Sequence, residues 1–392
     1  MSTESTKKAD SWKAGKTSFT EDGIRMIELE AGSNVIKKLR EDWQAFAAAI
    51  PPYPGGFEGR GIVICAGGLR YFTCAWINIH VLKKTGCSLP IEVWYTGNEF
   101  TPEVIATLTD LGVTCRNAND HSKLPIDGLA LKPFAILNTR FKEVLYLDAD
   151  NICTANPEQL FENETYRQGG TIFWPDIWVT DKNNPIWKII DASDYDSIEQ
   201  ESGQILINKE TCWKELNLCM YFNEQRQYYY TMLLGDKDTF RFAWKALQSP
   251  YYMIPKPVAY CGYTNKNDNS FFGLSMAQHD PIGNILFIHR NLLKWDITAP
   301  GETIWKEIRQ FKADARQKVI NGKYINTPNG LGFNVIDVQG EVETLDFRHL
   351  LGDLEKECLQ ILNALRDSPM YGRYLLHTYF CYFKPQYLHN TN

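Results

Sequence analysis

The chain has 392 residues, of which 44% are hydrophobic and 22% are charged, as in ordinary soluble globular proteins. A formal net charge of -6 argues against nucleic-acid binding, which needs a basic surface, and it also disfavours anionic membrane surfaces. The 10 cysteines form no closely spaced CxxC pair, so the sequence indicates neither a zinc or redox site of that kind nor a disulfide scaffold. No apolar run approaches the roughly 18 residues of a membrane span.

The N-terminal segment differs in composition from the rest of the chain. Residues 1–20 are rich in Ser, Thr and Lys, which predicts disorder. Residues 34–50 have helical spacing of apolar side chains and stop at two prolines. We therefore interpret residues 1–60 as a disordered N-terminus followed by a leading helix and a linker.

Apolar strands and amphipathic helices then alternate, which predicts an α/β domain with parallel strands and right-handed crossovers. The predicted strands are residues 61–66, 91–95, 113–116 and 144–147. The predicted helices between them are residues 69–79, 102–111 and 131–141. Further on, strands are predicted at residues 171–174, 204–208 and 285–288, and helices at residues 209–218, 224–234 and 238–247. We place this domain at residues 61–300 and expect residues 301–392 to form a C-terminal helical extension packed on it.

Two carboxylates, Asp148 and Asp150, follow the apolar run at residues 144–147. They stand at the carboxyl end of a buried strand, which is where open α/β sheets place ligands. Residues i and i+2 of an extended chain point the same way, so both carboxylates can converge on one hard divalent cation. Such a pair also occurs on solvated loops, but its position after a buried strand favours a metal site.

The end of the first strand and the start of a later helix are candidate phosphate contacts. Ala66 and Gly67 let a nucleotide approach the backbone at a helix N-terminus, although a tight turn explains them equally. Lys132 begins the helix that leads to the Asp pair, where it either contacts phosphate or faces solvent. The sequence has no GxGxxG and no GxxxxGK[ST] pattern, so dinucleotide and ATP-kinase sites are disfavoured.

Two polar clusters flank the predicted strands of the second half. Asp176 and Trp178 stand at a strand end, where they form either an acceptor cleft or a packed turn. Glu201 and Gln204 precede the next strand, where they serve either in turn formation or as groups presented to a site.

Two more candidates lie further along the chain. Asp236 and Asp238 form a second acid pair at a predicted helix N-terminus, where they complement the helix dipole and can also reach a site. His289 ends the strand at residues 285–288 and is followed by Lys294. Because Mn²⁺ accepts imidazole together with carboxylates, His289 is a candidate third metal ligand, although a structural role is the more common one for such a residue.

Taken together, these motifs resemble metal-dependent glycosyltransferases of the GT-A fold. The segment LKPFAILNTRFKEVLYLDADN is similar to their lysine, helix, strand and DxD unit. Within that class the chain resembles the fungal Mnn-type α-1,2/α-1,3-mannosyltransferases through FWPDIW, ESGQILINKETCW, GDKDTFRFAWKAL and HRNLLKW. The likeness runs from about Gly61 to Trp295. It implies a GT-A-like nucleotide-sugar-binding fold with a mixed, mainly parallel central sheet flanked by helices, and a catalytic role for residues 61–300.

The resemblance also implies roles for the candidate residues. It implies Mn²⁺ held by Asp148, Asp150 and His289, with Lys132 and Lys294 near the diphosphate of the donor. The remaining expected donor contacts are Ala66 and Gly67, the expected acceptor contacts are Asp176 and Trp178, and the expected catalytic group comprises Glu201, Gln204, Asp236 and Asp238. A divalent cation and lysines would stabilise the charge that develops on a leaving diphosphate.

The expected function is a retaining, metal-dependent α-mannosyltransferase that moves mannose from GDP-mannose to a mannoside, another glycan or a glycoprotein. A retaining hexosyltransferase that uses a UDP-sugar and a catalytically degenerate carbohydrate-binding module are the alternatives. The polar segment after Met1 indicates a cytoplasmic protein. A fragment of an anchored family member would instead belong to the Golgi lumen.

Overall fold

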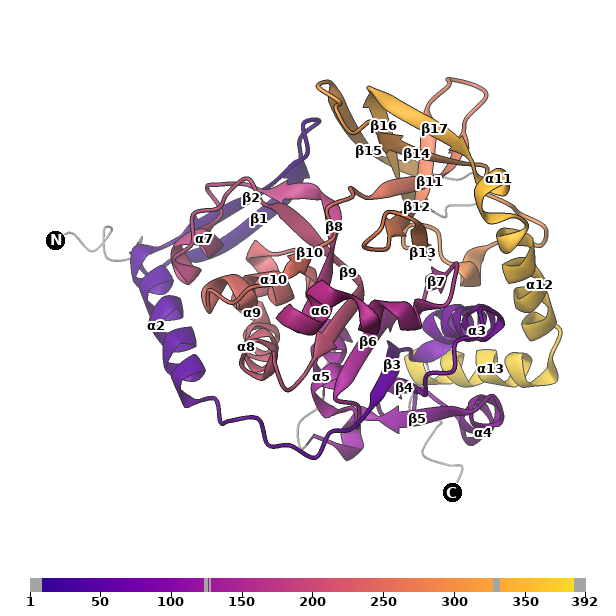
Figure 1. Ribbon diagram of the computed structural model, residues 1–392, viewed down its shortest axis with the longest axis horizontal. Helices are drawn as coiled ribbons and strands as arrows, with labels where there is room; N and C mark the ends of the chain where they lie inside the picture. Colours follow the sequence, from indigo (N-terminus) through magenta and orange to yellow (C-terminus); the bar gives the residue numbers. More distant parts are fainter. Residues whose placement is uncertain (1–8, 123–125, 127, 327–331, 384–392) are drawn as a thin grey trace.

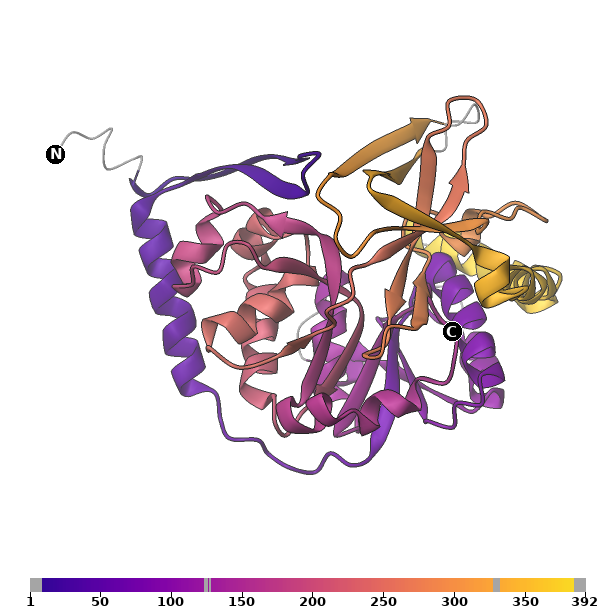
Figure 2. The same cartoon turned by 45° about the horizontal axis from the view of Figure 1, so that its top comes forward.

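The computed structural model describes residues 9–122, 126, 128–326 and 332–383. Two sheets organise this part of the chain: a nine-stranded mixed sheet and an eight-stranded antiparallel sheet that stands beside it (Figures 1 and 2). Within the same ranges, no helix has both the length and the apolar content needed to cross a bilayer.

The larger sheet has the strand order β1-β2-β8-β9-β6-β3-β4-β5, with β10 paired to β8. Its strands are β1 (Trp12–Phe19), β2 (Ile24–Ala31), β3 (Arg60–Cys65), β4 (Ile91–Tyr95), β5 (Val113–Asn117), β6 (Glu143–Asp148), β8 (Thr171–Thr180), β9 (Ile198–Asn208) and β10 (Tyr252–Met253). Strands β3 to β6 pair in parallel, and β9 is antiparallel to both of its neighbours. The predicted α/β class with a mixed, mainly parallel sheet is therefore confirmed.

Helices cover both faces of this sheet, which explains why its central strands are continuous apolar runs. The helices of this part are α2 (Ser33–Ala49), α3 (Gly68–Lys84), α4 (Pro102–Asp110), α5 (Leu131–Asn138), α6 (Glu164–Gly169), α7 (Pro185–Ile190), α8 (Trp213–Glu224), α9 (Arg226–Met232) and α10 (Lys237–Ala246). Side chains alternate along β3, so Ile62 and Ile64 pack in the core cluster that contains α3, whereas Val63 packs in the cluster that contains α5 and α8.

The second sheet brings distant parts of the chain to the edge of the first. Its strands are β7 (Asn151–Cys153), β11 (Ala259–Thr264), β12 (Phe271–His279), β13 (Ile285–His289), β14 (Glu307–Phe311), β15 (Lys318–Asn326), β16 (Gly332–Gly340) and β17 (Val342–Asp346). Strand β7 begins directly after Asp150 and pairs antiparallel with β13, in a register that sets His289 opposite Asn151. This pairing places His289 beside the Asp pair although 139 residues separate His289 from Asp150.

Three C-terminal helices follow the second sheet: α11 packs on β14 and β17, whereas α12 and α13 pack beside α3 (Figure 1). They are α11 (Phe347–Leu351), α12 (Leu354–Arg366) and α13 (Pro369–Phe383). Short 3₁₀ helices complete the description: η1 (Ala118–Asp120), η2 (Gly128–Ala130), η3 (Pro157–Glu162) and η4 (Trp295–Ile297). Helices α12 and α13 contact α3, and the hydroxyl of Tyr371 lies 2.9 Å from the hydroxyl of Thr73.

The two flanks of the chain differ from the expectation. Residues 12–31 form a hairpin, although the sequence predicted disorder up to residue 20. The part of that prediction that concerns residues 1–8 lies outside the described residues. The hairpin could not be predicted from the sequence because β1 is mostly exposed and has no apolar alternation. The pairing of β2 with β8 and the buried Arg25–Glu199 ion pair hold it in place. Residues 301–392 are not purely helical, because strands β14 to β17 precede the helices.

Strands β8 and β9 are longer than predicted. Strand β8 continues past Pro175, where the pairing with β9 changes register and a missing N–H is tolerated. Strand β9 begins six residues before the predicted start at residue 204. As a result, Asp176, Trp178 and Glu201 lie inside strands and not in turns.

Candidate functional site

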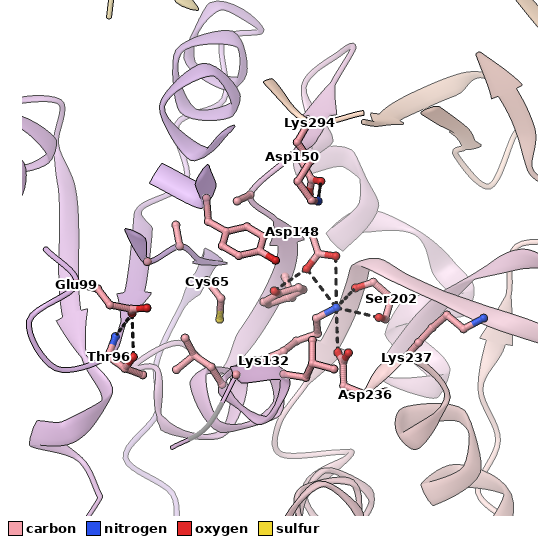
Figure 3. A pocket seen from close by; sticks show the side chains of 18 of the residues that line it. Cys65, Thr96, Glu99, Lys132, Asp148, Asp150, Ser202, Asp236, Lys237 and Lys294 are labelled. Atoms are coloured by element: carbon pink, nitrogen blue, oxygen red, sulfur yellow. Dashed lines mark hydrogen bonds and ion pairs between the residues drawn. The ribbon is translucent and has the colours of Figure 1, made fainter. Parts of the chain in front are cut away.

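A pocket of about 400 Å³ opens at the carboxyl edge of the parallel strands. Strands β3, β4 and β6 end there, and α5 begins there, because the crossover from β5 returns to the sheet from that edge. Eight of the predicted site residues line the pocket: Ala66, Gly67, Lys132, Asp148, Asp150, Glu201, Asp236 and Lys294. Figure 3 shows the side chains of Lys132, Asp148, Asp150, Asp236 and Lys294 gathered on one side of the cavity.

Carboxylates and one imidazole converge at the centre of this charged side. His289 Nε2 lies 3.2 Å from Asp150 Oδ1 and 3.7 Å from Asp148 Oδ2. On the other side of the ring, His289 Nδ1 lies 3.2 Å from Glu201 Oε1. His289 does not line the cavity itself, but it joins three acids that do.

The electrostatics of this cluster follow from burial and from its mixed charges. Burial disfavours the imidazolium form of His289. The nearby carboxylates of Asp150 and Glu201 outweigh this effect of burial and raise the pKa of His289 to about 10. Burial likewise disfavours the Glu201 carboxylate, but the hydrogen bond and charge of His289 lower the pKa of Glu201 to about 2. Lys294 and His289 lower the pKa of Asp150 in the same way. Asp150 and Glu201 are therefore ionised at neutral pH.

Lys132 is the cation at the floor of the pocket. Its Nζ lies 3.1 Å from Asp148 Oδ1 and 3.1 Å from Asp236 Oδ2, and it donates hydrogen bonds to the hydroxyl and the carbonyl oxygen of Ser202 at 2.8 and 3.0 Å. Burial opposes the charged form, but Asp148, Asp236 and Glu201 raise the pKa of Lys132 above its ordinary value. Lys132 thus stays charged while it is surrounded by acids.

Two further lysines border the same space. Lys294 forms an ion pair with Asp150, and its Nζ lies 5.5 Å from the centre of the Tyr71 ring. Lys237 forms ion pairs with Asp176 and Glu199. These cations are the charges that the pocket offers to an anionic ligand.

Besides His289, four predicted site residues do not line the pocket. Gln204 stands three residues after Glu201 in β9, so the two side chains leave opposite faces, and Gln204 accepts a hydrogen bond from Asn151 at 2.6 Å. Asp238 is fully buried and pairs with Arg241 and Arg25 at 3.2 and 3.6 Å, away from the cavity. Gln204 and Asp238 therefore contact other side chains and do not reach the cavity.

The two expected acceptor contacts also lie outside the cavity. Trp178 packs on Phe19 of the hairpin, with ring centroids 4.5 Å apart. Asp176 is buried, which raises its pKa to about 6 against the pull of Lys237. Asp176 is therefore joined to the pocket through its ion pair with Lys237.

Eleven lining residues were not predicted, among them Tyr71, Thr96, Glu99, Tyr146, Ser202 and Lys237. The hydroxyl of Tyr146 donates to Asp148 Oδ1 at 2.8 Å. Its position two residues before Asp148, on the same side of the strand, is a signal that could have identified it. Thr96 and Glu99 follow the end of β4, and the same strand-end rule that drew attention to the Asp pair applies to them.

The donor set fits a divalent transition-metal ion. One ligand atom each from Asp148, Glu201 and His289 lie within 4.8 Å of one another. Carboxylate oxygens with an imidazole nitrogen suit Mn²⁺. The set expected from the sequence had Asp150 where this group has Glu201; Asp150 is the neighbouring acid that His289 also contacts.

The chain matches a known family across the region that builds the pocket. Residues 59–200 and 193–280, together more than half of the chain, match the family described as "Mannosyltransferase putative". The chain is 27% identical over 303 residues to alpha-1,2-mannosyltransferase MNN2 of Candida albicans, covering 61% of this chain and 51% of that protein. It is 26% identical over 297 residues to alpha-1,2-mannosyltransferase MNN5 of Saccharomyces cerevisiae, covering 59% and 50%.

The chain spans about half the length of these curated relatives. Among solved structures it is similar to the WbbM bifunctional glycosyltransferase, with a TM-score of 0.38, 13% identity and coverage of 53% of this chain and 40% of that one. That likeness is too remote to bear on the site. The family match, by contrast, includes the strands and helices that carry Asp148, Asp150 and Glu201. The chain therefore belongs to this family and is similar to its fungal Mnn-type members.

Proposed function

We propose that this protein is a retaining, metal-dependent α-mannosyltransferase that uses GDP-mannose and transfers mannose to a mannoside or another glycan. The observation that carries the proposal is the convergence of acids, one imidazole and three lysines on a single pocket at the carboxyl edge of the sheet. The choice of sugar rests on the relatives, which are alpha-1,2-mannosyltransferases.

The charged side of the pocket suits the diphosphate of a donor. Asp148 and His289, with Asp150 or Glu201, would hold Mn²⁺, which when bound neutralises charge on the leaving diphosphate. Lys294 adds a fixed positive charge at the rim, and Lys132 keeps the neighbouring carboxylates oriented. Both lysines are held by contacts that exist before the donor binds, so little reorganisation is needed during reaction.

The acids nearest the expected sugar position are each tied to a cation. Glu201 lies against His289, and Asp236 lies against Lys132. A carboxylate that is neutralised in this way is a weak nucleophile, which favours attack from the same face over a covalent glycosyl-enzyme. In that reaction the acceptor oxygen bonds to the anomeric carbon as the bond from that carbon to the phosphate oxygen breaks. The hydroxyl proton passes to the departing diphosphate.

The proposal is tested with a panel of nucleotide sugars. The purified chain is incubated with GDP-mannose, UDP-glucose, UDP-galactose or UDP-N-acetylglucosamine, with methyl α-mannoside as acceptor, in Mn²⁺ or in EDTA. We expect turnover of GDP-mannose alone, in Mn²⁺ alone, with an α-linked product by NMR. Asp150→Asn should abolish it without lowering the thermal unfolding temperature by more than a few degrees.

Two results would contradict the proposal. Turnover of a UDP-hexose and not of GDP-mannose would show that the donor is different. Stabilisation by mannosides with no turnover of any nucleotide sugar would favour a carbohydrate-binding module.

A further inference from the structure

We infer that Glu99 reads the base of the donor nucleotide and selects guanine over uracil. The inference rests on the proposed function, in which the donor is a nucleoside diphosphate sugar. Glu99 lies in the loop between β4 and α4 and lines the pocket with Thr96. In Figure 3 these two residues stand across the cavity from Asp150, Lys237 and Lys294.

The spacing of the strands places the Glu99 loop about one nucleoside away from the Asp pair. Strand β3 lies between β4 and β6, and the registers align Trp94, Cys65 and Asp148 at one level. Two strand spacings amount to about 10 Å, so the loop after β4 is about one nucleoside away from the Asp pair. A nucleotide whose diphosphate lies beside Asp148 therefore directs its base to Glu99.

The Glu99 carboxylate is held at one oxygen and open at the other. Its Oε2 accepts hydrogen bonds from the backbone N–H and the hydroxyl of Thr96, both at 2.8 Å. Across the part of the chain that the structure describes, no side chain or backbone group hydrogen-bonds to Oε1. A carboxylate oxygen has two acceptor sites, so Oε1 can accept two adjacent donors.

Gly67 is required for this position of the carboxylate. A Cβ added at Gly67 would lie 2.0 Å from Glu99 Oε2, closer than any real contact. The glycine that the sequence suggested for nucleotide approach therefore also makes room for the acid that would read the nucleotide.

Helix α13 supports the loop from behind. The hydroxyl of Tyr374 donates to the backbone carbonyl of Glu99 at 2.8 Å, and His377 Nε2 lies 2.7 Å from the carbonyl oxygen of Asn98. The loop backbone is thus fixed independently of any ligand, which a selective site needs. This support comes from outside residues 59–280, the region that the family match covers.

Hydrogen-bond chemistry makes a carboxylate selective for guanine. Guanine presents two adjacent donors, N1–H and the exocyclic amine, whereas uracil presents one N–H between two carbonyl oxygens that a carboxylate repels. Loss of a paired recognition contact of this kind weakens discrimination roughly 10- to 100-fold. Inosine lacks only the exocyclic amine, and xanthosine replaces that donor with a carbonyl oxygen.

The experiment is calorimetric titration with GDP, UDP, IDP and XDP in Mn²⁺. The unmodified chain should bind GDP at least tenfold more tightly than UDP, with IDP between them. Glu99→Gln keeps an acceptor for Thr96 but presents an amide N–H₂ to the base in place of a carboxylate oxygen. GDP affinity should therefore fall at least tenfold, and XDP, which has a carbonyl oxygen at that place, should bind more tightly than GDP. Gly67→Ala should weaken GDP in the same way by displacing the carboxylate. Glu103→Gln, which removes an acid paired with Arg373 of α13 outside the pocket, should leave the preference unchanged.

The outcomes separate the two hypotheses. If the unmodified chain prefers UDP or binds no nucleoside diphosphate, both the proposed donor and the role of Glu99 are wrong. If the unmodified chain prefers GDP to UDP but binds IDP as tightly as GDP, and Glu99→Gln leaves the GDP affinity unchanged, only the role of Glu99 is wrong. Equal weakening of GDP and UDP by Glu99→Gln would assign Glu99 to the ribose and overturn base reading.

Discussion

Replacing Lys132 by methionine tests the charge balance on which the pocket depends. Methionine keeps most of the apolar stem but removes the ammonium group that lies 3.1 Å from both Asp148 and Asp236. Within the described ranges, Asp236 has no second ion-pair partner. The substitution therefore leaves a buried carboxylate without its cation.

The expected loss of stability depends on pH. Removing one partner of a buried ion pair destabilises a protein by about 3–5 kcal/mol while the other partner stays charged. Burial already raises the pKa of Asp236 against the pull of Lys132, so without Lys132 this pKa rises further. A carboxyl whose pKa is raised on folding loses its contribution to stability as the pH rises through the folded-state pKa. We expect Lys132→Met to lose about 1–2 kcal/mol at pH 5, where Asp236 can be protonated, and about 3–5 kcal/mol at pH 8.

The assay is urea unfolding in EDTA, followed by tryptophan fluorescence at both pH values. In the Asp236→Asn background, Lys132→Met should cause a much smaller loss that no longer increases with pH. Lys142→Met removes a half-exposed lysine that pairs with Glu210, and should change stability by about 0–1 kcal/mol. An equal loss at pH 5 and pH 8, or full additivity with Asp236→Asn, would refute the reasoning.

Three further predictions concern the metal and donor contacts. His289→Ala should raise the Mn²⁺ concentration for half-maximal activity at least tenfold, whereas an unchanged Mn²⁺ titration would exclude His289 as a ligand. Lys294→Ala should weaken GDP binding about tenfold by calorimetry, because a charge-assisted contact is lost. The pKa of His289 in the metal-free protein is raised to about 10, above its unfolded value of about 6.5. The contribution of His289 to stability is therefore complete below about pH 6.5 and is lost towards pH 10, which denaturation at several pH values would check. Mn²⁺ affinity should rise with pH over the same window, which metal titration at the same pH values would check.

The parallel half of the larger sheet could be predicted because each of its elements carries a local pattern. Strand β4 has the bounds that the sequence predicted, residues 91–95, since it is apolar except for Glu92 and is buried on both faces. The Asp pair could be placed at a site because the end of a parallel strand is defined by the apolar run before it. Such patterns need no knowledge of which strand lies next to which.

Strand β13 of the second sheet was predicted, but the arrangement of this sheet was not, because some of the pairs that assemble it join residues that are far apart. Gly273 lies opposite Ile336, and Phe287 lies opposite Cys153. Antiparallel strands with one exposed face, such as β15, show little apolar character of their own. Their formation is decided by tertiary contacts, which local propensity does not contain.

The same limit separates the site residues that reach the pocket from those that do not. Asp236 and Asp238 are two residues apart at the start of α10, where each residue turns by about 100°, so their side chains leave the helix about 200° apart. One therefore meets Lys132 in the pocket while the other is buried against Arg241. An acid pair that converges in a strand diverges in a helix, so the chemistry of such a pair follows from the element that carries it.

The position of His289 shows how much of the centre depends on one strand pairing. Strand β7 starts directly after the Asp pair, and its antiparallel register with β13 sets His289 opposite Asn151. A slip of one residue would turn the imidazole to the other face of the sheet and separate it from Asp150 and Glu201. The apolar residues Ile152 and Ile288, paired and fully buried in the same ladder, oppose such a slip because it would expose them to the polar side. The hydrophobic core thus fixes the register, and the register assembles the acids and the imidazole at one point.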